Sequence, residues 1–346
     1  MEETPSAHQP TAPVPDAVSA ADAQARWDTI VVGGGAAGLS AAQMLGRARR
    51  RVLVIDAGEP RNRFAAHMHG VLGHDGADPL DLLAAGRAEA AAYGVRVVRG
   101  SVARVTPDAQ RPATLEVTTT PDEATGSPLV LAARTLVVAT GLSDVLPDVP
   151  GLAERWGTSV LHCPYCHGWE VRGRRLGVLA TSPLALHQVQ LVRQWSEHVS
   201  LLAAGLGPLD DAVARRLRAR GIDLVTADPV EVVGDGPSLT GVRTDDGAVV
   251  RLDALFVAGA PRPHDAFLAP LRLERTDTAA GSFLAVDPTG RTSHERVWAV
   301  GNVVAPAATV PMAMGAGATT GGAVNMALVT EDFDRAVAER VEVPRA

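Results

Sequence analysis

Residues 28–38 read Asp28-Thr29-Ile30-Val31-Val32-Gly33-Gly34-Gly35-Ala36-Ala37-Gly38, an apolar run that ends in a cluster of glycines. The run predicts a buried parallel strand, and the segment from Ala36 to Arg49 predicts the helix that follows it. Gly33 permits a tight turn, Gly35 lets a pyrophosphate approach the backbone, and Gly38 allows the helix to pack closely on the strand. The stretch therefore predicts a dinucleotide-binding unit.

An acid at the end of the next predicted strand supports this interpretation. That strand covers Arg51 to Asp56, and Asp56 has the spacing expected of a carboxylate that binds ribose hydroxyls. The first N–H groups of the helix, at Ala36 and Ala37, have no partner within the helix and face the phosphates. Since Asp56 argues against a 2′-phosphate, the predicted ligand is FAD or NAD(H).

The rest of the chain repeats the alternation of strands and helices. After a strand predicted over Leu136 to Thr140, the proline-containing stretch 147–151 precedes a second series, which begins with a strand at Leu176 to Ala180. Such alternation is typical of open sheets with helices on their faces. We therefore predict an α/β fold of two Rossmann-like domains, the second inserted in the first. The expected parts are a disordered tail at 1–25, a cofactor domain at 26–148 and 262–332, an inserted domain at 149–261, and a C-terminal tail at 333–346.

Composition excludes several functions. The chain has 346 residues, a formal net charge of −7 and 32 basic residues, all of them arginine. Without lysine it cannot form a Walker-type phosphate loop, a pyridoxal Schiff base or a kinase site. The mild acidic excess argues against nucleic acid. Prolines and glycines interrupt the uncharged stretch 297–330, which argues against a membrane span, and residues 1–24 do not resemble a signal peptide. We expect a cytoplasmic protein.

Both cysteines lie in the segment Leu161-His162-Cys163-Pro164-Tyr165-Cys166-His167. The order C-x-x-C-H also occurs at c-type haem attachment sites, which need an exported apoprotein, and a structural zinc site would need a second pair of ligands. Two inert buried thiols are a third alternative, which the proline between the cysteines disfavours. A redox dithiol fits best, because a sulfur at a helix N-terminus is stabilised as the thiolate. We predict no metal site.

Together these motifs resemble those of low-molecular-weight thioredoxin reductases over residues 27–329. Two further segments carry the resemblance. Ala139-Thr140-Gly141 resembles a turn of two-dinucleotide flavoproteins, and Gly301-Asn302 stands where those proteins place Gly-Asp on the flavin ribityl chain. The resemblance implies FAD as the cofactor and a homodimer. The cofactor contacts expected in addition to the glycine turn and Asp56 are Arg61, Val102, Thr140, Gly141, Gly301, Asn302, Val310 and Met312.

The same resemblance assigns roles around the cysteine motif. It implies that Cys166 lies nearer the flavin and that Cys163 exchanges with substrate. The family usually has an acid after the second cysteine, whereas this chain has His167. We predict that His167 takes a proton from an incoming thiol and returns it, the alternative being a structural hydrogen bond to the backbone. His69 is a possible pocket residue.

The nucleotide turn expected in the second domain is missing. Its first strand runs into Thr181-Ser182-Pro183, which contains no glycine, so side chains obstruct the approach of a pyrophosphate. The next strand, expected to be followed by arginines, continues as Leu202-Ala203-Ala204-Gly205. In these respects the chain resembles thioredoxin reductase-like dithiol oxidases, which close disulfides in gliotoxin-, holomycin- or romidepsin-type compounds.

This second resemblance implies an FAD-dependent oxidase. A small-molecule dithiol would become an intramolecular disulfide, with O2 as the acceptor and H2O2 as the product. One alternative is a disulfide reductase fed by NAD(P)H or a protein donor. The other is a flavin-binding redox sensor without enzymatic activity, which the intact Cys163-Pro164-Tyr165-Cys166-His167 segment disfavours.

Overall fold

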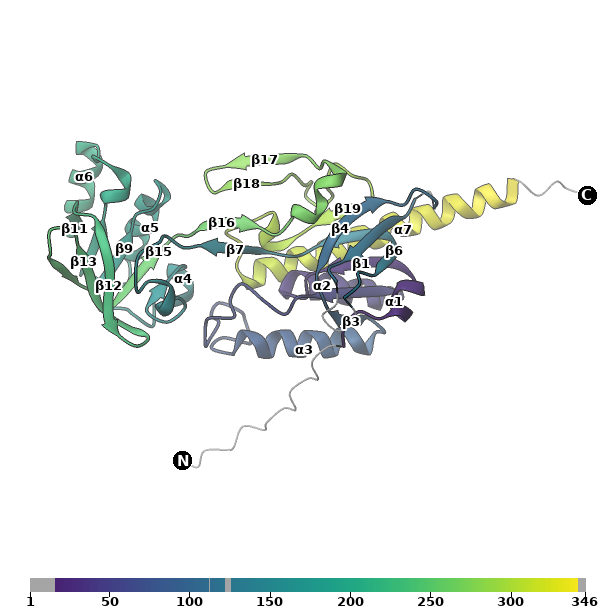
Figure 1. The fold of residues 1–346 in the computed structure, drawn as a ribbon, viewed down its shortest axis with the longest axis horizontal. Coiled ribbons are helices and arrows are strands. Elements are labelled where there is room, and N and C mark those ends of the chain that lie inside the picture. The colour runs from purple at the N-terminus through teal and green to yellow at the C-terminus, as the bar shows by residue number, and fades with distance from the viewer. Residues whose placement is uncertain (1–15, 112, 122–125, 342–346) are drawn as a thin grey trace, which may run out of the picture.

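The computed structural model describes residues 16–111, 113–121 and 126–341. The chain forms two α/β lobes joined by a two-stranded ribbon (Figure 1). The ribbon pairs β7 (Leu142–Val145) with β16 (Ala260–Pro263) in antiparallel register. We call residues 16–141 and 264–341 the first lobe and residues 146–259 the second lobe. The predicted fold class, two Rossmann-like α/β domains with the second inserted in the first, is confirmed.

A seven-stranded sheet forms the centre of the first lobe. Its order is β3-β2-β1-β6-β5-β4, with β19 also paired to β6. The parallel strands are β3 (Arg96–Arg99), β2 (Val52–Asp56), β1 (Arg26–Val32), β6 (Val130–Val138) and β19 (Val297–Ala299). The antiparallel additions are β5 (Leu115–Thr119) and β4 (Val102–Pro107).

Side chains of β1 alternate between two cores. Ile30 and Val32 pack on one face, whereas Val31 packs on the other face with α2 (Ala36–Arg47) and α7 (Val310–Val341). A Cβ on Gly317 of α7 would lie 2.2 Å from the Ala37 carbonyl oxygen of α2. The small residues of α7 therefore let the two helices approach to backbone contact, while α3 (Pro79–Ala92) lies alongside α2.

The second lobe contains a parallel sheet of order β11-β10-β9-β15-β8 and a separate antiparallel sheet, β12-β13-β14. The parallel strands are β8 (Val160–Leu161), β9 (Leu176–Leu179), β10 (Val199–Leu202), β11 (Ile222–Val225) and β15 (Ala254–Val257). The antiparallel ones are β12 (Pro229–Asp235), β13 (Ser238–Thr244) and β14 (Val249–Arg251). Helix α5 (Leu184–Val192) connects β9 to β10, and α6 (Asp211–Arg218) lies between β10 and β11.

The structure corrects both expected tails. Residues 1–15 of the predicted N-terminal tail lie outside the described residues, but Ala20–Gln24 form α1, capped by Ser19. The Trp27 indole holds this segment, because its Nε1 donates to the Asp22 carbonyl at 3.0 Å.

At the other end, α7 runs through Val341 instead of ending near residue 332. Asp332 anchors this continuation, since its carboxylate lies 2.7 Å from both Arg50 and Arg134. Among the described residues, no helix combines the length and apolar character that a membrane span requires.

Candidate active site

The glycine turn after β1 forms a cradle for a ligand. Gly33 has a φ of +104°, and a Cβ there would lie 2.4 Å from the Ala139 carbonyl oxygen. A Cβ on Gly38 would lie 1.9 Å from the Gly33 carbonyl oxygen, so protein packing requires both glycines. At Gly35, in contrast, no atom lies within 4 Å of the Cβ position. Gly35 therefore leaves open space at the N-terminus of α2, where a pyrophosphate fits.

Asp56 is fixed by the same turn. Its Oδ1 accepts the N–H of Gly34 at 3.0 Å, whereas its Oδ2 accepts no hydrogen bond from the described residues. A Cβ on Gly34 would lie 2.7 Å from the Asp56 carboxyl carbon. Gly34 had no predicted role, although three consecutive glycines were a signal for one. With one carboxylate oxygen held and the other available to a ribose hydroxyl, these residues fit a dinucleotide cofactor.

Further predicted cofactor residues converge on this cradle. The Thr140 hydroxyl donates to the His264 carbonyl at 2.7 Å, and Gly141 adopts a φ of +67° beside open space. Gly301 has a φ of +80°, and its Cβ position lies 2.9 Å from that of Ala37, so it brings the turn after β19 against α2.

Val102 is the first residue of β4, two residues after Gly100. The Gly100 N–H donates to the Asp56 carbonyl at 2.9 Å. This hydrogen bond places the start of β4 beside the acid that is predicted to bind the ribose.

Asn302 organises the turn between β19 and α7. Its Nδ2 donates to the carbonyls of Ala305 and Ala308 at 3.0 Å each and to that of Pro306 at 3.3 Å. Its Oδ1 accepts no hydrogen bond from the described residues and is available to a hydroxyl group. The turn leads to Val310 and Met312 at the start of α7, where Met312 is 59% exposed.

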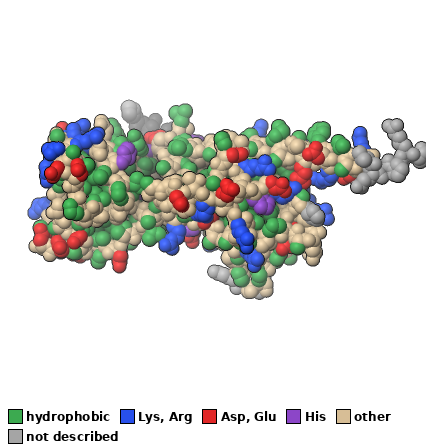
Figure 2. Space-filling view, turned by 90° about the horizontal axis from the view of Figure 1, so that it is seen from above, with side chains coloured by type: hydrophobic (Ala, Val, Ile, Leu, Met, Phe, Trp, Pro, Cys, Tyr) green, Lys and Arg blue, Asp and Glu red, His purple; other side chains and the backbone are tan. Residues whose placement is uncertain are grey.

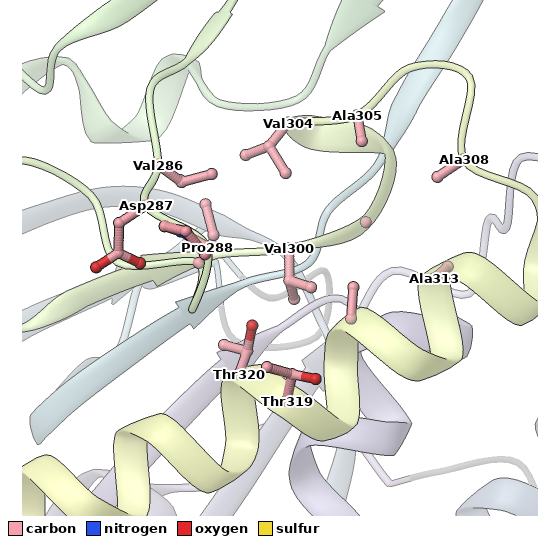
Figure 3. A pocket seen from close by; sticks show the side chains of 14 residues that line it. Val286, Asp287, Pro288, Val300, Val304, Ala305, Ala308, Ala313, Thr319 and Thr320 are labelled. Carbon is pink, nitrogen blue, oxygen red and sulfur yellow. The ribbon is translucent and has the colours of Figure 1, made fainter.

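A cavity of about 180 Å³ lies between the N-terminal half of α7, residues 286–290 and the turn after β19 (Figure 3). Thr319 and Thr320 border it from the helix, and its other walls are mainly small apolar side chains. Of the predicted site residues, Gly301 alone lines it. The cavity therefore shares Gly301 with the predicted cofactor site, and no residue of the cysteine motif lines it.

The cysteines form a disulfide at the start of the short helix α4 (Pro164–His167). We call residues 162–170 the redox turn. The Cys166 N–H donates to Cys163 Sγ at 3.2 Å, and Pro164 occupies the first helical position, where no N–H is needed. Both cysteines are half-buried. The N–H directed at Cys163 Sγ stabilises a thiolate at that position.

Two histidines of the redox turn are kept neutral by burial. Desolvation lowers the pKa of His167 below the usual 6.5; the charge of Glu170 opposes this, and His69 and His162 add to it. Desolvation likewise lowers the pKa of His162. The His167 ring forms no hydrogen bond with the described residues. The structural alternative for His167 is therefore not realised there, and its neutral ring can accept a thiol proton.

Arg61 links the two lobes beside the redox turn. Its Nε and Nη2 donate to the two carboxylate oxygens of Asp144 on β7, each at 2.7 Å. Its Nη1 donates to the Pro306 carbonyl at 2.7 Å, and Nη2 lies 3.4 Å from His162 Nε2. One guanidinium group thus joins the ribbon, the turn organised by Asn302 and the residue before Cys163. The redox turn consequently lies next to the predicted cofactor site.

His69 provides a second contact between the lobes. Its Nε2 lies 3.5 Å from Glu170 Oε1, and its Nδ1 lies 3.4 Å from Asp75 Oδ2. The Gly70 N–H fixes Asp75 at 2.8 Å. These contacts place His69 at the redox turn. Among the described residues, no cluster of three His, Cys, Asp or Glu side chains could hold a metal ion.

The turn after β9 in the second lobe differs from the glycine turn. The Thr181 hydroxyl donates to the Ala258 carbonyl at 2.8 Å. Pro183 occupies the N-cap position of α5 in helical conformation and supplies no N–H. This turn therefore presents side chains where the first lobe has Gly33 and Gly35.

Comparisons with known proteins bear on the whole chain. The family model described as pyridine nucleotide-disulphide oxidoreductase matches residues 27–321. Thioredoxin reductase tcpT of Claviceps purpurea (strain 20.1) is 32% identical over 321 residues, which cover 88% of this chain and 95% of that protein. Thioredoxin reductase sirT of Leptosphaeria maculans is 30% identical over 324 residues, which cover 89% of this chain and 96% of that protein. The crystal structure of HlmI has 43% identity and a TM-score of 0.85, covering 91% of this chain and 96% of that one.

Proposed function

The chain belongs to the pyridine nucleotide-disulphide oxidoreductase family, and we propose that within this family it acts as a dithiol oxidase. Its resemblance to thioredoxin reductases, and with it the class of dithiol–disulfide oxidoreductase, is confirmed. In our proposal FAD is the cofactor, the substrate is a small-molecule dithiol of natural-product type, and the product is its intramolecular disulfide. O2 accepts the electrons and gives H2O2.

The observation that carries this proposal is the turn at residues 181–183. Its side chains and the proline ring occupy the position of a nicotinamide-dinucleotide turn, while Arg61 holds the redox turn beside the first lobe. A redox disulfide next to a flavin site, without a nicotinamide site, favours electron entry from a dithiol.

The thiol–disulfide exchange between substrate and protein takes place at the redox turn. A substrate thiolate attacks Cys163 Sγ, which breaks the bond between Cys163 and Cys166 and leaves a mixed disulfide with a Cys166 thiolate. The second substrate sulfur then attacks the first, and Cys163 leaves as a thiolate that the Cys166 N–H stabilises. Neutral His167 takes the proton of the attacking thiol. The substrate loses two electrons and two protons, and the protein disulfide gains both as it becomes two thiols.

The cofactor role rests on the first lobe. The glycine turn, Asp56, Gly301 and Asn302 would hold FAD. When bound, FAD supplies the two-electron redox chemistry that returns the protein dithiol to the disulfide. Arg61 and Asn302 orient the turn at 302–308 beside the redox turn and keep both in one arrangement.

Oxygen consumption tests the proposal. The purified yellow protein, mixed with butane-1,4-dithiol under air, is expected to consume O2 and release H2O2 with the cyclic disulfide in equal amounts. Cys163→Ser should abolish this turnover and retain the flavin spectrum. Dithiol loss without oxygen uptake would contradict an oxidase.

The names of the similar proteins favour a second candidate function, a disulfide reductase fed by NAD(P)H or a protein donor. Anaerobic mixing with NADPH separates the two. Rapid bleaching of the flavin absorbance by NADPH would favour the reductase, whereas bleaching by dithiol alone supports the oxidase. Bound flavin that neither donor reduces would instead favour a redox sensor.

We further propose a homodimer that works in the cytoplasm. The exposed side of α7 carries Met312, Met326 and Phe333, which are 59%, 63% and 71% exposed. Large apolar side chains in such a row suit burial against a second copy. Light scattering should give twice the chain mass, and Met326→Arg should reduce that mass to one chain.

A further inference from the structure

Exposed aromatic side chains gather at the redox turn. Aromatic residues make up only 3% of the chain. In the part of the chain that the structure describes, the exposed ones are Phe64, Tyr93, Tyr165, Trp169 and Phe333. Tyr165 and Trp169 belong to the redox turn and are 73% and 64% exposed. Because exposing such rings forgoes their hydrophobic stabilisation, their concentration beside a reactive disulfide indicates a binding surface.

Tyr165 and Trp169 lie one helical turn apart. Gly168 continues the helical conformation of α4, and its N–H donates to the Pro164 carbonyl at 2.7 Å. Residues four apart in such a turn share one face of it. Trp169 also lies three positions after Cys166, and residues three apart are neighbours on such a turn.

Both rings are held in place by the second lobe. Tyr165 meets Trp195 edge-on, with ring centroids 5.7 Å apart. A Cβ on Gly168 would lie 2.6 Å from the Trp195 ring, so the turn packs directly on that indole. The Arg172 guanidinium lies 4.0 Å from the Trp169 ring centroid, and its Nη1 donates to the Trp169 carbonyl at 2.6 Å. The rings are therefore ordered before any ligand arrives.

Phe64 approaches from the first lobe. It is 48% exposed and lies between Arg61 and His69 in the segment that contacts the redox turn. A Cβ on Gly157 would lie 2.7 Å from that of Phe64, so the two lobes touch at this point. The Arg63 guanidinium lies 4.3 Å from the Phe64 ring centroid. Phe64 thus presents an exposed aromatic ring where the first lobe touches the second.

We propose that Tyr165 and Trp169, with Phe64 contributed by the first lobe, form a stacking subsite for a dithiol built on a planar aromatic or conjugated ring. This inference rests on the proposed function and specifies its substrate class. A planar ring offers the face that exposed aromatic side chains bind. Glu170, the residue after Trp169, lies 3.5 Å from His69 Nε2, so its carboxylate already has a partner other than a cationic substrate.

Two dithiols that close to rings of the same size test the subsite. Benzene-1,2-dimethanethiol and butane-1,4-dithiol both have four carbons between their sulfurs and both close to a six-membered cyclic disulfide. The holoenzyme is expected to prefer the aromatic dithiol by about ten-fold in kcat/KM, mainly through KM, as the usual worth of aromatic stacking implies.

Variants of the two rings, and of one aromatic residue elsewhere, test whether the rings themselves cause the preference. Trp169→Leu and Tyr165→Leu should each lower the preference for the aromatic dithiol about three- to five-fold, whereas Trp169→Phe should restore most of it. Tyr93→Leu is the matched control, because Tyr93 is also exposed under an arginine, with Arg47 at 4.8 Å, but lies remote from the redox turn. It should leave the preference unchanged.

An unchanged preference in both leucine variants, with bound flavin retained, would overturn the subsite. The subsite would also be overturned if the leucine variants lost only the ability to reduce a protein disulfide, because the rings would then be a protein-docking surface. The preference is also measured anaerobically, as the rate at which each dithiol reduces the Cys163–Cys166 disulfide, followed by alkylation and mass spectrometry. That measurement stands even if the enzyme does not consume oxygen, so failure of the subsite and failure of the oxidase proposal are distinguishable.

Discussion

The two lobes share the parallel core of their sheets but differ in the turn that follows its central strand. In the first lobe β1 pairs in parallel with β2 and β6, and in the second lobe β9 pairs in the same way with β10 and β15. After β1 come glycines that leave room for a pyrophosphate, whereas after β9 come Thr181, Ser182 and Pro183. The comparison teaches that a buried parallel sheet maintains its fold through its core, while nucleotide binding depends on a few turn residues that can be replaced.

The largest effect is expected from adding a side chain to the glycine turn. Gly35→Val puts its methyl groups into space that no protein atom occupies within 4 Å of the Cβ position. We expect about a hundred-fold loss of flavin affinity with a folded protein, because the side chain displaces a pyrophosphate rather than protein atoms. Flavin absorbance per chain measures the loss of flavin, and circular dichroism measures whether the protein is folded. Ser182→Val, the matched change in the second lobe, should keep the flavin; equal flavin loss in both variants would contradict the assignment of the two turns.

The next effect concerns the link between the lobes. Arg61→Ala removes the partner of Asp144, whose side chain is only 6% exposed, and frees the redox turn from the Pro306 carbonyl. We expect about a ten-fold slower flavin reduction by dithiol, because misplacing a reacting group costs at least that much. Flavin content should stay near that of Arg216→Ala, an exposed arginine on α6. A large loss of flavin would instead support the prediction that Arg61 contacts the cofactor.

A smaller effect is expected from pH. Burial lowers the pKa of His167 below 6.5, so its neutral form persists where an ordinary histidine is half protonated. Stopped-flow rates of flavin reduction, corrected for the thiolate fraction of the substrate, should fall less than about two-fold between pH 7.5 and 6.5 and more steeply below. The stability that the neutral ring contributes is likewise present above pH 6.5 and lost as pH falls through the lowered pKa. His167→Gln should lose this pH dependence; a profile with its midpoint above 6.5 would rule out a buried neutral base.

The smallest effect is expected from restoring glycines to the second lobe. The double variant Thr181→Gly and Ser182→Gly should change the rate of flavin reduction by NADPH less than about two-fold. Pro183 still removes an N–H, and the segment after β10 still lacks an arginine for a 2′-phosphate. Fast bleaching by NADPH in this variant would show that side chains at two positions are the whole difference between the lobes.

The local units of the fold were predictable because each depends on neighbouring residues. The strand before Gly33 and the helix that begins at Ala36 follow from an apolar run and from glycine positions, and the structure places both there. Cys163 and Cys166, predicted as a redox dithiol, form a disulfide. Predicted helix ends differ by a few residues, because terminal turns lack the full set of hydrogen bonds.

What escaped prediction depends on residues far apart in the chain. Arg61 meets Asp144 and Pro306, and His69 meets Glu170, and no local pattern identifies such pairs. The ribbon of β7 and β16 joins segments more than a hundred residues apart, its strands are short, and β16 contains two prolines. The continuation of α7 depends on Asp332 meeting Arg50 and Arg134, so its polar sequence alone resembles a tail.

The ribbon also determines which part of the chain can be replaced by a segment of a related protein. Ala260 pairs with Val145, so the chain leaves the first lobe and returns to it about 5 Å apart, the usual spacing of paired strands. A segment whose two ends lie so close together can be exchanged for another without opening the sheet that hosts it. The second lobe is thus a unit that can be exchanged as a whole. A related chain could exchange its dithiol specificity by transplanting residues 146–259 at two adjacent junctions, with the cofactor cradle left intact.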